Sequence, residues 1–256
     1  MKKQLLKSML MAVVGIGLLA GGAMADIYNN RPITTAMNPL IGPVGVNPTY
    51  PNEPLIQNIL NDAVGVNGIN SVTGQSNVAI WKEAEFDVAA YLITLHTGGN
   101  GQLGIYSFSN PSKVYDFGIG TGSGIGDQVG FNIKGDLGLY VNNVKVVENF
   151  GTSFGFYWKT GNTKYYTEDT KNSNNIARAL TYQIADGLSV KIGNDESNAE
   201  GNNDWILAFE DGTDFDFNDA VFYMEDLQAV PEPATMVLFG TGILGLAGIA
   251  RRRKSN

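Results

Sequence analysis

The amino-acid sequence predicts an all-β protein, an antiparallel β-sandwich of jelly-roll type with one short N-terminal helix. Short runs rich in β-branched and aromatic residues recur through most of the 256-residue chain, and such runs are typical of strands. Turn signals such as Asn-Asn, Thr-Gly-Asn and Ala-Asp-Gly separate them, as in hairpins. Many short strands at regular spacing favour a sandwich. The sequence contains no internal repeat, so we expect one domain over residues 26–229.

The helix is expected within residues 52–65. Leu55, Ile56, Ile59 and Leu60 form an apolar stripe at helical spacing, and Pro54 lies at the first turn. The expected strand segments are residues 86–95, 103–108, 113–119, 138–147, 154–167, 177–192, 204–209 and 220–225. Glycines at every second position from 118 to 126 fit neither a dinucleotide-binding motif nor a P-loop, so we expect a flexible loop there.

The first 25 residues are typical of a signal peptide. Lys2, Lys3 and Lys7 give the positive start, and an apolar run follows over residues 9–20. Ala23-Met24-Ala25 then places small residues at both specificity positions of a cleavage site. We therefore expect the chain to be exported, with residue 26 as the first residue of the mature protein.

The C-terminal end carries an apolar run followed by a basic cluster. Residues 234–250 hold no charge, and as a helix they would span roughly 25 Å, near the lower limit for a bilayer core. Arg251, Arg252, Arg253 and Lys254 follow, and basic residues remain on the cytoplasmic side. The sequence thus predicts a short transmembrane helix within residues 230–256, with the body on the far side of the membrane.

A sorting motif precedes this run. Pro231-Glu232-Pro233 contains two prolines, which prevent a helix or strand from continuing through it. With the short span and the Arg-rich end, Arg251 to Arg253, it resembles the PEP-CTERM sorting signal of Gram-negative bacteria. The resemblance implies processing by exosortase, a membrane transpeptidase-like enzyme, after a transient stay in the inner membrane. It also implies a final place at the cell surface or in the exopolysaccharide matrix of a biofilm.

Charge and cysteine content exclude several classes of function. Seven of the 17 basic residues and one of the 25 acidic residues lie outside residues 26–230, which leaves that region with a net charge of about −14. The phosphate backbone of a nucleic acid would repel such a surface, so we expect no nucleic-acid partner. Because the chain has no cysteine, disulfides, thiol chemistry and Cys-ligated zinc are excluded.

Catalytic signals are weak, and we expect no enzyme. His96 is the single histidine of the sequence, and no serine lies in a G-x-S-x-G elbow, so a Ser-His-Asp site has little support. Carboxylates are numerous, and two suitably placed acids are enough for glycoside hydrolysis. A polysaccharide-modifying hydrolase therefore stays open as an alternative.

The remaining candidate site is an acidic stretch near the end of the body. No Lys or Arg occurs between Lys191 and Arg251. The candidate metal ligands are Glu210, Asp211, Asp214, Asp216, Asn218 and Asp219. Ca²⁺ takes six to eight oxygen ligands, so the set suits a Ca²⁺ site in a hairpin or loop.

Strand periodicity leaves a second interpretation of this stretch open. As a plain strand, residues 214–218 would turn Asp214, Asp216 and Asn218 to water and their Phe neighbours to the core. The same alternation would place Asp219 on the core face, where an unpaired carboxylate is costly. A bend or a ligand for Asp219 is therefore expected.

The segments "WILAFEDG" and "DFNDAVF" carry a second resemblance. Together with "LGIYSFSNPSKVYDF" and "FGFYWKTGNTKYYTEDT" they are similar to an uncharacterised bacterial domain found before PEP-CTERM tails and in large surface adhesins. The resemblance covers most of residues 55–223 and implies an extracellular β-module with a divalent-ion role. The leading expectation is a structural or adhesive matrix protein with exosortase and exopolysaccharide as partners. A calcium-dependent carbohydrate-binding module is the main alternative.

Overall fold

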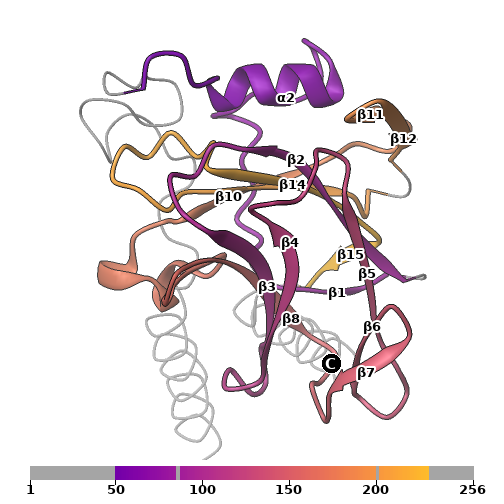
Figure 1. Ribbon diagram of the computed structural model, residues 1–256. Helices are drawn as coiled ribbons and strands as arrows, with labels where there is room; N and C mark the ends of the chain where they lie inside the picture. The colour runs from indigo at the N-terminus through magenta and orange to yellow at the C-terminus, as the bar shows by residue number, and fades with distance from the viewer. Residues whose placement is uncertain (1–49, 85–86, 200–201, 231–256) are drawn as a thin grey trace, which may run out of the picture. The chain divides into compact units, whose positions relative to one another are not determined.

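The computed structural model describes residues 50–84, 87–199 and 202–230, all of which belong to one compact unit, Asn30–Val230. The predicted signal peptide, the sorting motif and the predicted C-terminal helix lie outside the described residues. Figure 1 shows the described part as strands stacked in layers, with one helix above them. The fold class is confirmed as an antiparallel β-sandwich with one short helix.

The first layer is a six-stranded antiparallel sheet. Its strands run in the order β15-β1-β8-β3-β4, and β9 also pairs with β8. Their bounds are β1 (Trp81–Glu83), β3 (Gly101–Ser107), β4 (Val114–Gly120), β8 (Phe154–Thr160), β9 (Thr163–Tyr166) and β15 (Leu227–Ala229).

The second layer is a seven-stranded antiparallel sheet in the order β10-β13-β14-β2-β5-β6-β7. Its strands are β2 (Val88–Leu95), β5 (Gln128–Ile133), β6 (Leu139–Val141), β7 (Val144–Val147), β10 (Ala179–Gln183), β13 (Trp205–Phe209) and β14 (Ala220–Glu225). A separate hairpin joins β11 (Ser189–Ile192) to β12 (Asp195–Asn198), and two short 3₁₀ turns cover Asp169–Lys171 and Ser173–Asn175.

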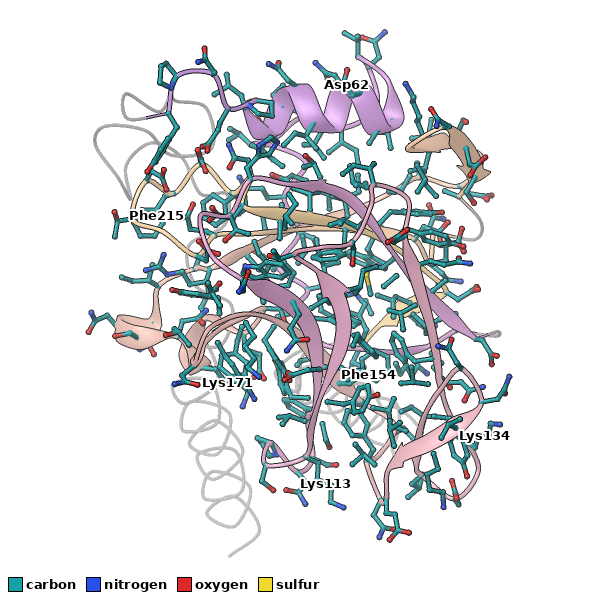
Figure 2. All side chains as sticks on the ribbon, viewed as in Figure 1. Asp62, Lys113, Lys134, Phe154, Lys171 and Phe215 are labelled. Atoms are coloured by element: carbon teal, nitrogen blue, oxygen red, sulfur yellow. The ribbon has the colours of Figure 1, made fainter. Side chains whose placement is uncertain are left out.

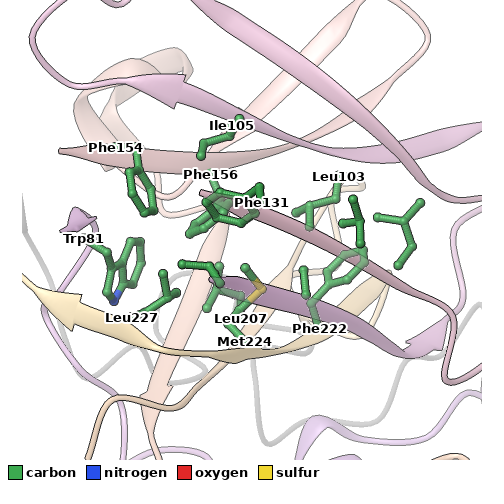
Figure 3. Close-up of a cluster of buried hydrophobic side chains, with 14 of the residues drawn as sticks. Trp81, Leu103, Ile105, Phe131, Phe154, Phe156, Leu207, Phe222, Met224 and Leu227 are labelled. Carbon is green, nitrogen blue, oxygen red and sulfur yellow. The ribbon is translucent and has the colours of Figure 1, made fainter. Parts of the chain in front are cut away.

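The main core fills the space between the two sheets. Trp81, Leu103 and Phe156 from the six-stranded sheet meet Leu207 and Phe222 from the seven-stranded sheet (Figure 3), and all five are buried. Burying one such side chain stabilises the fold by roughly 1.5 to 3 kcal/mol. Period-two alternation along each strand supplies these residues, because successive side chains point to opposite faces of a sheet.

Helix α2 (Ile56–Val64) covers the other face of the seven-stranded sheet (Figure 1). Ile56 and Leu60 pack there against Ile206 and Val221, so β13 and β14 are buried on both faces. Double burial explains why "WILAF" and "AVFYM" are continuous apolar runs rather than alternating ones. The helix ends at Val64, and the next residue, Gly65, has a φ of +84°, which glycine adopts without a steric cost.

Most predicted strand segments are present, with several corrections. The Ala-Asp-Gly turn separates β10 from β11 as expected, but the two strands do not form a hairpin, since β10 pairs with β13 and β11 with β12. Strands β1, β5, β12 and β15 were not predicted. Gly118 and Gly120 belong to β4 and not to the expected glycine-rich loop, because Gly120 pairs with Gln102 of β3. The helix is shorter than residues 52–65, since Pro54 and Leu55 precede its first residue.

Candidate functional site

All six predicted metal-ligand candidates lie on the loop that joins β13 to β14, residues 210–219. Phe209 pairs with Ala220, so the loop leaves and re-enters the sheet at neighbouring positions. Phe215 and Phe217 both have left-handed backbone conformations, with φ of +59° and +56°, which are unusual for bulky residues. The segment is therefore not a plain strand, and the bend expected before Asp219 is present. Figure 2 labels Phe215 on this loop.

Glu210 and Asp219 lie on the inner side of the loop. Glu210 is fully buried, and its carboxylate accepts hydrogen bonds from the N–H groups of Gly212 (2.7 Å) and Phe217 (3.2 Å). Arg178 approaches Oε1 of Glu210 at 3.9 Å. Asp219 accepts a 2.5 Å hydrogen bond from the N–H of Asp211. Both carboxylates thus brace the loop from within.

Burial sets the protonation of this inner pair. It raises the pKa of Glu210 well above its usual range, and repulsion from Asp219 and Asp214 adds to the rise. The pKa of Asp219 is raised for the same reason, burial first and repulsion from Asp211 next. Loss of solvation disfavours the charged form of a carboxyl group, so these two residues favour protonation at a pH where ordinary carboxyls are charged.

Asp211 ties the loop to the six-stranded sheet. A single carboxylate oxygen, Oδ2, accepts hydrogen bonds from Thr97 Oγ1 (2.6 Å), Trp158 Nε1 (2.9 Å) and Thr160 Oγ1 (2.8 Å). These donors come from the end of β8 and from the turn before β3. The Oδ2 atom of Asp211 is thus occupied by hydrogen bonds within the protein.

Asp214 and Asp216 form a second group with a residue that the sequence did not indicate. Carboxylate oxygens of Glu53, Asp214 and Asp216 all lie within 4.8 Å of one another. Glu53 stands just before α2, more than 150 positions earlier in the chain. Burial raises its pKa, and the charges of Asp216 and Asp214 raise it further. No periodicity or spacing connects Glu53 to the loop, so sequence reasoning had no signal for it.

Asn218 completes this outer group. It is 1% exposed, and its Nδ2 donates to Asp216 Oδ2 and to the carbonyl oxygen of Pro54, both at 3.0 Å. Its other amide atom, Oδ1, is buried without a hydrogen-bond partner. A buried acceptor in that state costs roughly 1 to 3 kcal/mol unless a ligand or water satisfies it.

His96 is the other residue that the sequence offered for catalytic chemistry. His96 follows β2, contacts Thr94 Oγ1 through Nε2 at 3.0 Å, and donates its backbone N–H to the carbonyl oxygen of Asp219. Burial lowers the pKa of His96.

Within residues 50–84, 87–199 and 202–230, no helix is long and apolar enough to cross a membrane.

Comparisons with known proteins find a family match at the chain end and solved structures of low similarity. No curated protein matches the chain. Among solved structures, the Ralstonia solanacearum high-affinity mannose-binding lectin is 9% identical, covers 60% of this chain and 97% of its own, and has a TM-score of 0.29. The Chromobacterium violaceum lectin CV2L, in complex with alpha-methyl-fucoside, is 13% identical, covers 61% and 100%, and has a TM-score of 0.26.

The family model of the PEP-CTERM protein-sorting motif matches residues 229–254. The match contains Pro231, Glu232, Pro233 and the three arginines from which the motif was predicted. Such a motif implies export, transient membrane anchoring and processing by exosortase. The resemblance of residues 55–223 to an uncharacterised surface domain stays a prediction. The chain is therefore identified as a protein that carries a PEP-CTERM sorting domain at its C-terminal end.

Proposed function

We propose that the protein is a non-enzymatic structural or adhesive component of the cell surface or exopolysaccharide matrix, and that it binds Ca²⁺ at Glu53, Asp214 and Asp216. The observation that carries the cation proposal is the convergence of three carboxylates from two distant segments within 4.8 Å. The proposed ligand set differs from the predicted one, because among the described residues the three carboxylates whose oxygens come within 4.8 Å of one another are those of Glu53, Asp214 and Asp216.

The chemistry of this set suits a hard cation. Three carboxylates offer at least three oxygens, and bidentate binding or water can complete the six to eight that Ca²⁺ takes. The left-handed residues Phe215 and Phe217 separate Asp214, Asp216 and Asn218 along the loop. A cation here would also fasten the segment before α2 to the β13–β14 loop, which favours a structural role.

Thermal unfolding of residues 26–230 with and without millimolar Ca²⁺ tests the cation. A hundredfold excess over the dissociation constant adds about 2.7 kcal/mol of stability, and Mg²⁺ serves as the control. We expect the Ca²⁺-specific rise to vanish in Glu53→Gln and Asp216→Asn and to persist in Asp62→Asn, an exposed acid on α2. A rise in melting temperature that persists in both variants would mean that Ca²⁺ binds at another site. No rise in the wild type would contradict the proposal that the protein binds Ca²⁺.

Cell fractionation tests the sorting half of the proposal. We expect the wild-type chain to lose its C-terminal tail and to appear in the extracellular or matrix fraction. Replacement of Arg251, Arg252 and Arg253 by Ser removes the basic stop, so the uncut chain is expected to remain with the cells. Normal processing and release of that variant would contradict a role for the basic cluster.

A further inference from the structure

A polar pocket lies at the end of the six-stranded sheet where β3 begins and where β4 and β8 end. Its volume is about 350 Å³, and its lining residues are Asn100, Gly101, Gln102, Gly118, Thr121, Lys159 and Gly161. This volume falls within the range of small-molecule sites. The usual apolar lining of such sites is absent, because the named residues are glycines and polar side chains.

Backbone and hydroxyl contacts hold the walls of the pocket. The N–H of Gly101 donates to Thr121 Oγ1 at 2.8 Å, and this hydroxyl donates to the carbonyl oxygen of Gly99 at 3.1 Å. Gly118 and Gly161 have left-handed backbones, and a Cβ atom at either position would meet nothing within 4 Å. The space in front of the strands therefore stays open while its frame is fixed.

A carboxylate orients the polar groups of the pocket. Asp116 on β4 accepts hydrogen bonds from Lys159 Nζ (2.5 Å), Gln102 Nε2 (3.2 Å) and Tyr157 Oη (2.5 Å). Donors held in this way need little further ordering when a ligand binds. The Lys159–Asp116 ion pair also cancels the charge of the lysine, so the pocket favours a neutral ligand over an anionic one.

The acidic loop supports the same frame from the other side. Thr97 and Thr160 both donate to Asp211, and Thr160 stands between the lining residues Lys159 and Gly161. The turn before β3 and the end of β8 are thereby tied to one anchor. Asp211 acts as a positioning residue for the pocket and not as a ligand-binding one.

We propose that this pocket binds a neutral hexose unit of a polysaccharide. Amide, hydroxyl and ammonium groups together donate and accept hydrogen bonds as the hydroxyls of a sugar require, and the polar lining disfavours an apolar ligand. Tyr157 is fully buried, so its ring cannot stack on a sugar. The pocket would therefore hold the sugar by hydrogen bonds. The inference rests on the proposed matrix function for the source of the sugar, and it does not depend on the cation.

Ligand-observed saturation-transfer NMR tests the pocket. The full-length chain is purified in a detergent without a sugar headgroup, in millimolar Ca²⁺, and mixed with the methyl α-glycosides of glucose, galactose and mannose. We expect transfer to at least one of them and a weaker signal for glucuronic acid. Loss of one or two hydrogen bonds in Asn100→Leu or Lys159→Met should weaken binding about five- to fiftyfold.

Matched variants outside the pocket show whether a loss of binding comes from the pocket or from the kind of substitution itself. Asn58→Leu on α2 and Gln128→Leu on β5 make the same kinds of change at exposed positions, and they are expected to bind like the wild type. Melting temperatures establish that each variant is folded. No transfer to any glycoside, or equal transfer in all variants, would overturn the proposal. The Ca²⁺-dependent melting shift, measured on the same preparation, reports separately on the cation site.

Discussion

Substitution of Glu83 by Gln should remove a pH-dependent loss of stability. Glu83 ends β1 in the six-stranded sheet, and its Oε1 accepts the backbone N–H of Ile133 at the end of β5, in the opposite sheet. Burial raises the pKa of Glu83 from 4.5 to about 7; the Ile133 hydrogen bond lowers it somewhat, and repulsion from Asp87 adds to the rise. Burial and the nearby Asp87 charge therefore outweigh the Ile133 hydrogen bond, and the fold is most stable when this carboxyl is protonated.

The sign and size of the effect follow from linkage. Because the pKa is higher in the folded state, its stabilising contribution is complete below about pH 4.5 and is lost as the pH rises through about 7. At about 1.4 kcal/mol per pH unit, the shift corresponds to about 3 kcal/mol, and solvent screening at this half-buried position reduces it to about 1 to 2 kcal/mol. Gln keeps the acceptor oxygen and carries no charge.

Urea unfolding between pH 4.5 and 8.5 measures this prediction. We expect Glu83→Gln to match the wild type at pH 4.5 and to exceed it by about 1 to 2 kcal/mol at pH 8. Glu148→Gln, at an exposed loop position, controls for the change in net charge. A constant difference for Glu83→Gln over the whole range would refute the reasoning.

Two further predictions concern packing and hydrogen bonding, and equilibrium unfolding tests both. Gly104→Ala should destabilise the fold by about 1 to 3 kcal/mol, because its Cβ would lie 2.2 Å from the ring of Tyr157, whereas Gly98→Ala meets nothing within 4 Å and should be neutral; equal effects would contradict the packing argument. Asp211→Ala should cost about 2 to 4 kcal/mol, since it removes three hydrogen bonds and leaves the buried Trp158 Nε1 without its partner; a cost below about 0.5 kcal/mol would contradict the anchoring role.

Local chemistry made much of the fold predictable. The Asn-Asn pair of "GLYVNNVKVV" became the turn between β6 and β7, with Asn142 and Asn143 both left-handed at φ of +48° and +64°, as a two-residue hairpin turn requires. The short strands β1 and β15 were missed because each has three residues and gains its stability from the other. Trp81 pairs with Ala229, a contact across nearly 150 positions that no local pattern reveals.

The sequence located the acid-rich loop but could not show which of its acids lie together in the fold. The acid-rich composition identified the β13–β14 loop, and the cost of placing Asp219 on a core face correctly required a bend. Which acids face inward depends on the left-handed residues Phe215 and Phe217, a conformation that residue type disfavours. Glu53 joins the loop through the docking of α2, and tertiary packing of that kind leaves no trace in local sequence.

The register of β3 and β8, in contrast, has a signal in the sequence. The segments "LGIYS" and "FGFYW" both contain a Gly followed two positions later by a Tyr. In the antiparallel pairing of β3 with β8, Gly104 stands opposite Tyr157 and Tyr106 opposite Gly155. A Cβ on Gly104 would lie 2.2 Å from the ring of Tyr157, and one on Gly155 would lie 2.4 Å from the ring of Tyr106.

Each tyrosine therefore lies flat over the glycine of the neighbouring strand, which shields a position that otherwise weakens a sheet. A slip of two residues in one direction would place Tyr106 opposite Tyr157, and a slip in the other direction would place Gly104 opposite Gly155, so either slip would leave the glycines without a facing tyrosine. The repeated motif thus fixes the register of β3 and β8, and with it the positions of Gln102 and Lys159 at the mouth of the pocket.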